Sequence, residues 1–230
     1  VSGVKSSRTY DEAVALIAEA VKPLGEGYRD TLISGLTSER WVDRYENEGK
    51  RSGAFSAGGY IGKPYILTNY EDDVLDSVFT LIHEGGHSMH SWYSSRSNPF
   101  MCYSYSIFEA EVASTFNENL LSRYLLSTSQ SDEEKAYILG KNLDDIVATL
   151  FRQTMFAEFE LYAHRAEQRG EALTVDSMSK AYLKLNKKYY GKGVVHDRQI
   201  RYEWARIPHF YNAFYVYKYA TGLTAAVTLA

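Results

Sequence analysis

The stretch TLIHEGGHSMHSWY, residues 80–93, holds the side chains best suited to chemistry, because it gathers three of the chain's six histidines beside Glu84. On a helix, His83 and His87 project from one face about 6 Å apart along the axis, so two imidazoles can bind one metal ion. Glu84 lies one position round the helix, within reach of a metal-bound water without being a ligand. This HExxH arrangement is typical of sites in which zinc lowers the pKa of its water and the glutamate takes the proton as that water attacks a carbonyl.

The third histidine, His90, is a poor candidate for a further ligand. A catalytic zinc usually has three protein ligands and one open position. His90 lies about 10 Å along the axis from His83, too far for one ion with bonds of about 2 Å, so we expect it to support the site from outside the ligand set or to pack nearby. The HExxHxxGxxH scheme also fails, since position 90 is not Gly and position 93 is Tyr.

The third ligand should therefore come from another helix, and the next predicted helix offers Glu109, Glu111 and Glu118 in SIFEAEVASTFNENL. Glu111 and Glu118 are seven residues apart and share a face, whereas Glu109 points about 200° away from Glu111. Only one of Glu109 and Glu111 can face the metal.

A chance match and a different metal protein are the alternatives to a zinc site. HExxH occurs by chance in roughly one chain of this length in several hundred. The preceding run DSVFTLI is apolar at helical spacing, which favours an active-site helix embedded in a core. A ferritin-like di-iron bundle is an alternative, because EGGH at 84–87 satisfies Glu-x-x-His; that fold needs a second such pair, and the nearest, Glu160 and His164, is spaced by four.

The hydrophobic pattern predicts a mainly α-helical fold with one small β-sheet or hairpin just before the histidine helix. Residues 51–70, rich in glycine and carrying short apolar runs, are the good strand candidate. Helices are expected over residues 8–22 with a Thr9–Glu12 capping box, 27–46 divided near Gly35 and Ser38, 73–93, 107–126, 131–170 and 175–190.

Composition narrows the class of protein. The 230 residues are 45% hydrophobic, and 25 basic against 29 acidic residues give a net charge of −4, which predicts neither nucleic-acid nor membrane-surface binding. Without a membrane-length apolar run or a signal segment, a cytoplasmic protein is expected. The single cysteine, Cys102, allows no internal disulfide and is expected to be buried or half-buried. The start at Val1 and the uncapped end TGLTAAVTLA predict part of a longer protein.

Four ordered stretches resemble the thimet oligopeptidase and oligoendopeptidase F family of zinc peptidases. They span most of residues 51–222: GAFS with PYILTNY, HEGGHSMHS, IFEAEVASTFNE, and EWARIPHFYNAFYVYKYATG. Four motifs in order are far more specific than HExxH alone. One departure is the pair Gly85 and Gly86. Adjacent glycines weaken a helix by about 1 kcal/mol each, which predicts close backbone packing against a neighbour.

The resemblance implies a role for each residue of the site. His83, His87 and Glu111 would bind one Zn²⁺ per chain. Glu84 would be the general base. Glu118 would orient a zinc-bound histidine.

The resemblance also implies donors for the negative charge that builds on the attacked carbonyl oxygen. His209 matches the family's histidine. Tyr211, Tyr215 and Tyr217 all remain candidates for the tyrosine, because the interval after the histidine is shorter here than in thimet oligopeptidase. His164 and His196 lack such context and are expected to be structural or exposed.

The segment Gly53, Ala54, Phe55 and Ser56 would supply a strand edge beside the zinc. An extended peptide could pair with that edge through backbone hydrogen bonds. A simple structural hairpin is the alternative.

Motifs and resemblance together predict one zinc-peptidase catalytic domain over residues 1–230, a metalloendopeptidase that hydrolyses internal bonds of short peptides. The restriction to short peptides is implied by the family, whose members enclose the site in a deep channel. The alternative is an incomplete fragment that binds zinc or peptide without turnover.

Overall fold

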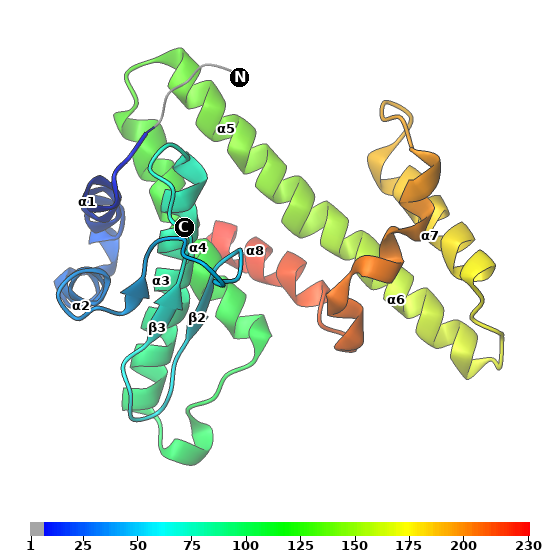
Figure 1. The fold of residues 1–230 in the computed structure, drawn as a ribbon, viewed down its shortest axis with the longest axis horizontal. Helices are drawn as coiled ribbons and strands as arrows, with labels where there is room; N and C mark the ends of the chain where they lie inside the picture. The colour runs from blue at the N-terminus through cyan, green and yellow to red at the C-terminus, as the bar shows by residue number, and fades with distance from the viewer. Residues whose placement is uncertain (1–6) are drawn as a thin grey trace. The chain divides into compact units, whose positions relative to one another are not determined.

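The computed structural model describes residues 7–230, which divide into two compact units. The first unit comprises residues up to 142 together with 222–230, and the second comprises residues 143–221. The helices are α1 Tyr10–Ala20, α2 Glu26–Leu36, α3 Leu75–Ser97, α4 Ile107–Thr128, α5 Asp132–Ile146, α6 Arg152–Gln168, α7 Val175–Tyr190 and α8 Tyr217–Leu229 (Figure 1). The strands are β1 Val42–Asp43, β2 Phe55–Ala57 and β3 Tyr65–Leu67. The predicted mainly α-helical fold with a small sheet is confirmed.

Side-chain caps set the start of two helices in the first unit. Thr9 and Glu12 form the predicted capping box of α1. Ser106 and Glu109 form a second box at the start of α4, where the Glu109 carboxylate accepts a hydrogen bond from the Ser106 N–H at 3.1 Å. Glu109 therefore caps the start of α4, unlike Glu111 and Glu118 of the same helix.

The predicted hairpin is present, but the sheet has a third strand. β2 pairs antiparallel with β3, Ser56 lying opposite Ile66, and β1 pairs parallel with β3. The prediction of helix for the second part of residues 27–46 was wrong, because α2 ends at Leu36. The Trp41 ring packs onto Gly35, where a Cβ would lie 2.3 Å from it, and the Trp41 carbonyl accepts a hydrogen bond from the Ile66 N–H. This long-range pairing outweighs the local helical pattern.

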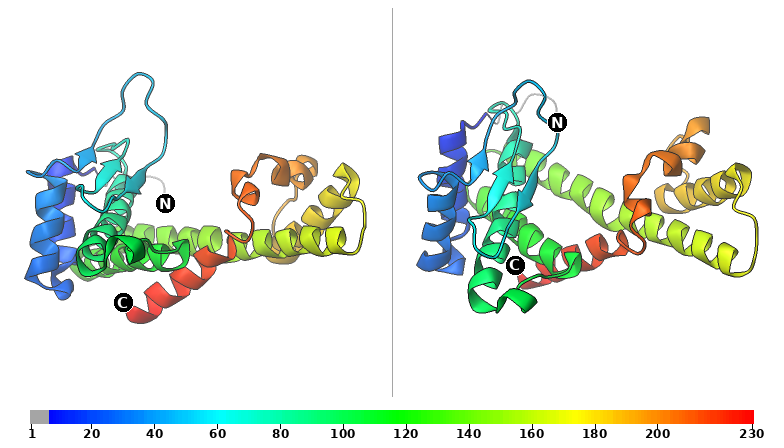
Figure 2. Two further views of the ribbon diagram at one scale, coloured as in Figure 1. Left: turned by 90° about the horizontal axis from the view of Figure 1, so that it is seen from below. Right: turned by 60° about the horizontal axis from the view of Figure 1, so that its bottom comes forward.

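Helices α3 and α4 pack side by side in the first unit, with the sheet lying against α3 (Figures 1 and 2). The apolar run before His83 is buried, as predicted, and contributes Val78, Phe79, Leu81 and Ile82 to the core. A Cβ on Gly86 would lie 2.7 Å from the Cα of Ser114, and one on Gly85 would lie 3.0 Å from Leu32. The close packing predicted from the adjacent glycines is confirmed.

The second unit is built on α6, α7 and the 3₁₀ helix Arg198–Arg206. The helical run predicted over residues 131–170 contains a π-helical segment, Val147–Phe151, between α5 and α6. Aromatic rings dominate the core of this unit, which holds Met155, Phe156, Phe159, Tyr182, Ile207 and Val216.

Two further findings concern the exposure of Cys102 and the apolar character of the helices. Cys102 is exposed, so the expectation of burial was wrong; it ends the 3₁₀ turn Phe100–Cys102 that follows α3, away from either core. Between residues 7 and 230, no helix combines the length and apolar character needed to cross a membrane.

Candidate metal centre

Helices α3 and α4 bring His83, His87 and Glu111 together, with one ligand atom from each lying within 4.8 Å of the others. The two Nε2 atoms of the histidines are 3.1 Å apart, and Glu111 Oε2 lies 3.8 Å from His83 Nε2. Zinc bonds of about 2.0–2.1 Å at tetrahedral angles place ligand atoms about 3.3 Å apart, so the three side chains fit one ion. Metal binding by these residues stays a prediction.

Both histidines are oriented through other groups. His83 donates its Nδ1–H to Glu118 Oε1 at 3.0 Å, and His87 makes a hydrogen bond with the backbone of Ala110. Such outer partners fix the ring and the tautomer and leave Nε2 available to a metal. The family resemblance implies this role for Glu118, and the structure shows the hydrogen bond that the role needs. The Ala110 contact was missed, because a backbone group leaves no signal in residue identity.

Glu84, which follows His83 in α3, is a buried acid. It is 7% exposed, and its Oε2 has no hydrogen-bond partner within residues 7–230. Burial raises the pKa of Glu84 to about 7, although the charge of His83 opposes the shift. A pKa near neutrality is suited to accepting and returning a proton at neutral pH.

The neighbouring groups show that negative charge is concentrated here. Burial would lower the pKa of His83, but the hydrogen bond to Glu118 and the surrounding carboxylates raise it to about 9. Burial and the charge of His83 lower the pKa of His87 to about 3, and burial raises the pKa of Glu111. A cluster of buried carboxylates facing a neutral imidazole is electrostatically suited to a divalent cation.

His90 stands outside this group. Its ring stacks on Tyr105 with centroids 3.7 Å apart and planes 13° from parallel. Its Nδ1 is buried without a partner in the described chain, and burial lowers its pKa. The contacts are those of a packing residue.

The predicted substrate segment runs along α3 beside the cluster. The Ser56 hydroxyl lies 2.8 Å from that of Ser88, one residue after His87. Gly58 continues over Ser91, where any Cβ would lie 2.3 Å from the serine Cβ. Because the strand order is β1-β3-β2, β2 is an edge strand whose outer side pairs with no described strand.

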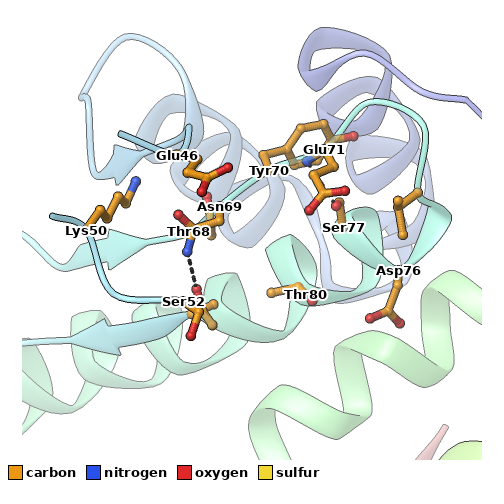
Figure 3. A pocket seen from close by; sticks show the side chains of 13 residues that line it. Glu46, Lys50, Ser52, Thr68, Asn69, Tyr70, Glu71, Asp76, Ser77 and Thr80 are labelled. Atoms are coloured by element: carbon orange, nitrogen blue, oxygen red, sulfur yellow. Dashed lines mark hydrogen bonds between the residues drawn. The ribbon is translucent and has the colours of Figure 1, made fainter. Parts of the chain in front are cut away.

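Asn69 fixes the approach to this strand and was not singled out from the sequence. Its Nδ2 donates to the carbonyls of Arg51 and Gly53, each at 2.9 Å. It lies in a cavity of about 400 Å³ between the loop before β2 and the first turns of α3 (Figure 3). Gly53 adopts φ +87°, a conformation that glycine accepts without strain, so the position suits the residue. The cavity is lined by other residues than the metal-binding candidates.

In the second unit, His209 lies in a cluster of tyrosines. The Tyr219 hydroxyl is 3.3 Å from His209 Nε2, and the Tyr215 ring lies 5.7 Å from the histidine ring. Tyr211 and Tyr217 are exposed, at 87% and 44%. Of the three predicted tyrosines, Tyr215 is the one whose ring packs on His209. Tyr219 was missed because nothing in the spacing distinguishes it.

The other histidines of this unit have structural contacts. His164 stacks on Phe214 with ring centroids 4.7 Å apart, and Glu160, 7% exposed, accepts the Phe214 N–H at 2.7 Å. Phe214 has φ +58°, which is strained for a bulky residue, so Glu160 and His164 hold this turn after His209 in place. His196 lies between Asn186 and the Gly191 carbonyl.

Comparison with known proteins gives a consistent result. The sequence matches peptidase family M3 over residues 9–230. It is 48% identical over 227 residues to the oligoendopeptidase F homolog of Borreliella burgdorferi, covering 99% of this chain and 38% of that protein. It is 50% identical over 222 residues to oligopeptidase PepF of Bacillus subtilis, covering 96% and 33%. The crystal structure of oligoendopeptidase-F from Enterococcus faecium matches with 38% identity and a TM-score of 0.65, covering 95% of this chain and 32% of that one.

The chain therefore spans between a third and two fifths of the length of the curated relatives it matches. The family match extends over nearly all of the chain's own residues. On that match, the chain belongs to peptidase family M3.

Proposed function

We propose that the chain carries the catalytic centre of a zinc-dependent oligoendopeptidase, which hydrolyses internal bonds of short peptides. The observation that carries the proposal is the convergence of His83, His87 and Glu111 within 4.8 Å beside a buried glutamate with an unpartnered oxygen. The names of the relatives, oligoendopeptidase F homolog and oligopeptidase PepF, support the class of substrate.

His83, His87 and Glu111 would hold the ion, and Glu118 would keep the His83 ring in its ligating tautomer. When bound, Zn²⁺ supplies Lewis acidity toward a peptide carbonyl and toward water. Glu84 takes the proton of the attacking water on its free Oε2 and delivers it to the leaving amine. Its raised pKa suits both transfers, because neither protonation state is strongly favoured near pH 7.

His209 with a neighbouring tyrosine is proposed to donate hydrogen bonds to the oxyanion. This assignment depends on the resemblance of EWARIPHFYNAFYVYKYATG to the family motif. The contacts of His209 with Tyr215 and Tyr219 support these two as the tyrosines to test first.

The edge strand β2 is proposed to receive the peptide backbone, with Gly53, Ala54, Phe55 and Ser56 as its contact segment. Backbone pairing at an edge strand binds peptides with little dependence on their side chains. The Ser56–Ser88 hydrogen bond supports this proposal, because it fastens the strand next to His87.

The test combines metal analysis with cleavage of a quenched fluorescent peptide. We expect about one zinc per chain in the wild type, and in Glu84→Gln retained zinc with hydrolysis reduced by at least about a hundredfold, the low end of general-base contributions. Glu111→Ala should lose the metal, whereas the matched variant His90→Ala should keep it. Two irons per chain would overturn the proposal. Zinc without any cleavage would favour a fragment that binds but does not turn over.

A further inference from the structure

The end of the β2–β3 hairpin and the turn after α3 together expose a cluster of aromatic rings. Tyr60, Phe100 and Tyr103 form it, with ring centroids 5.2 to 5.9 Å apart. We call these three rings the aromatic platform. Phe100 is 62% exposed, and the neighbouring Ile61 and Met101 are 96% and 85% exposed.

Large apolar side chains grouped at the surface in this way mark a binding site more often than chance, because their exposure costs free energy in water. The platform belongs to the same unit as the metal-binding candidates, so its position relative to them is defined by direct contacts.

The first set of contacts follows the strand. β2 and α3 run in the same direction, since Ser56 contacts Ser88 and Gly58 lies over Ser91. Tyr60 is four residues beyond Ser56. At about 3.3 Å per extended residue, the platform begins within about 13 Å of the point where the strand meets the metal-binding helix.

The second set of contacts follows the helix and gives a similar distance. The Ser94 hydroxyl donates to the carbonyl of Tyr103, which fixes the platform beside Ser94. Ser94 is seven residues, or about 10 Å, along α3 from His87. A length of 10 to 13 Å corresponds to about three or four residues of extended peptide.

We infer that the aromatic platform binds an aromatic or large aliphatic side chain of the peptide substrate, three or four residues to one side of the cleaved bond. The inference rests on the proposed function, because it takes the occupant to be the peptide paired with β2. β2 is an edge strand, and the chain that continues from it past Ser91 reaches Tyr60, so a peptide extended along that edge in the same direction can reach the platform. An apolar side chain at that point would cover rings that are otherwise in water.

Peptides of uniform alanine and serine with a single phenylalanine test the inference. A length of about twelve residues lets the chain reach both the metal cluster and the platform. The phenylalanine is moved one position at a time, and the cut bond is located by mass spectrometry. We expect the cut to move with the phenylalanine and to stay three or four residues from it on the same side.

The variant Phe100→Ser should abolish this tracking, while Phe100→Tyr should restore it. Tyr45→Ser is the matched control, because Tyr45 is a 51% exposed aromatic residue of the same unit outside the platform, and it should keep the tracking. A cut that stays fixed as the phenylalanine moves, or tracking unchanged in Phe100→Ser, would overturn the inference.

Absence of all cleavage would count against the proposed function, and binding then decides the inference separately. Fluorescence anisotropy of a labelled peptide with Glu84→Gln should show about tenfold tighter binding when one alanine is replaced by phenylalanine, as expected for one buried aromatic contact. The gain should vanish when Phe100→Ser is added. Equal affinities for the two peptides would refute the role of the platform.

Discussion

The buried Glu203 of the second unit differs from the buried Glu84 and Glu111 of the first in the direction of its pKa shift. In the first unit, burial raises the pKa of both Glu84 and Glu111, and Glu84 Oε2 lacks a partner among the described residues. In the second unit, Glu203 accepts hydrogen bonds from Tyr182, Arg152 and Arg206, each at 2.6 Å. Burial alone would raise the pKa of Glu203, yet these partners lower it below its ordinary value.

The difference distinguishes a buried acid that stabilises the fold from a buried acid that is available to a ligand. A buried acid with its full set of donors stabilises the protein by its own contacts, as Glu203 does. A buried acid without them costs free energy and is retained where something else supplies the positive charge. Perturbed pKa values of the second kind cluster at functional sites. The comparison therefore supports the proposal that Glu84 and Glu111 serve a metal site, whereas Glu203 stabilises the second unit.

Zinc should produce the largest effect, and it should be confined to the first unit. At a free concentration about a thousand times its dissociation constant, the ion should raise the free energy of unfolding by about 4 kcal/mol. Hydrogen exchange measured by mass spectrometry should show slower exchange in α3 and α4 on adding zinc, with α7 unaffected by comparison. Glu111→Ala should remove the effect. Equal slowing in α7, or slowing that survives Glu111→Ala, would contradict the assignment.

Replacing Glu203, the buried acid that has hydrogen-bond donors, should destabilise the second unit by somewhat less than zinc stabilises the first. Glu203→Gln leaves Arg152 without its carboxylate and should cost about 3 kcal/mol. Because the folded pKa of Glu203 is lowered, its contribution is present above its unfolded pKa of about 4.3 and is lost as the pH falls through the folded value. Hydrogen exchange of α7, measured by mass spectrometry, should therefore show a weaker loss of stability in acid for the variant than for the wild type.

The control for this result is Glu158→Gln. Glu158 pairs with Lys188 at the surface, where both side chains are well exposed, so its removal should cost less than about 1 kcal/mol. A similar loss from both variants would mean that burial does not distinguish the two ion pairs.

The fold was predictable where the signal was local. The capping box at Thr9, the buried run before His83 and the bounds of α7 follow from residues within a few positions of one another. The short parallel strand β1 was not predictable, because it depends on pairing with Ile66, 24 residues away. The π-helical segment before α6 likewise leaves no mark in the hydrophobic pattern.

The candidate site divides in the same way. Helix geometry brought His83 and His87 together and excluded His90, and the face shared by Glu111 and Glu118 matches their positions beside the histidines. The contacts missed from the sequence were Asn69 to the Gly53 carbonyl, Glu160 to the Phe214 N–H and Tyr219 to His209. Two of these three end on a backbone group, whose position only the folded chain defines.

Adding a methyl group at Gly86, where α3 contacts α4, should have the next largest effect on the free energy of unfolding. Gly86→Ala would press on Ser114 and the Ala113 carbonyl, which cannot move independently of their helix, and should cost about 2 kcal/mol in the free energy of unfolding. It should also weaken zinc binding, because His87 and Glu111 lie on the two helices being forced apart.

Gly140→Ala provides the matched substitution. Gly140 is a helical glycine of the same unit with nothing within 4 Å of a Cβ, so alanine should stabilise by up to about 1 kcal/mol. Opposite signs for the two variants in urea unfolding would show that backbone contact, and not helix propensity, determines the glycine at position 86. A stabilised Gly86→Ala would show the reverse.

The smallest expected effect is on zinc affinity. It tests whether the Glu118 carboxylate acts on the metal through His83. Glu118→Gln keeps an acceptor oxygen for the His83 Nδ1–H but loses the charge that increases the basicity of the ring, so zinc affinity should fall about tenfold. Competition with a chromophoric chelator measures this directly, without reference to turnover. Glu109→Gln is the control on the same helix, since its carboxylate serves the α4 cap and its neutral analogue can still fill that role. If the two variants bind zinc equally well, Glu118 only packs against the histidine; a loss confined to Glu118→Gln means that its charge acts on the ion, as the contrast with Glu203 requires.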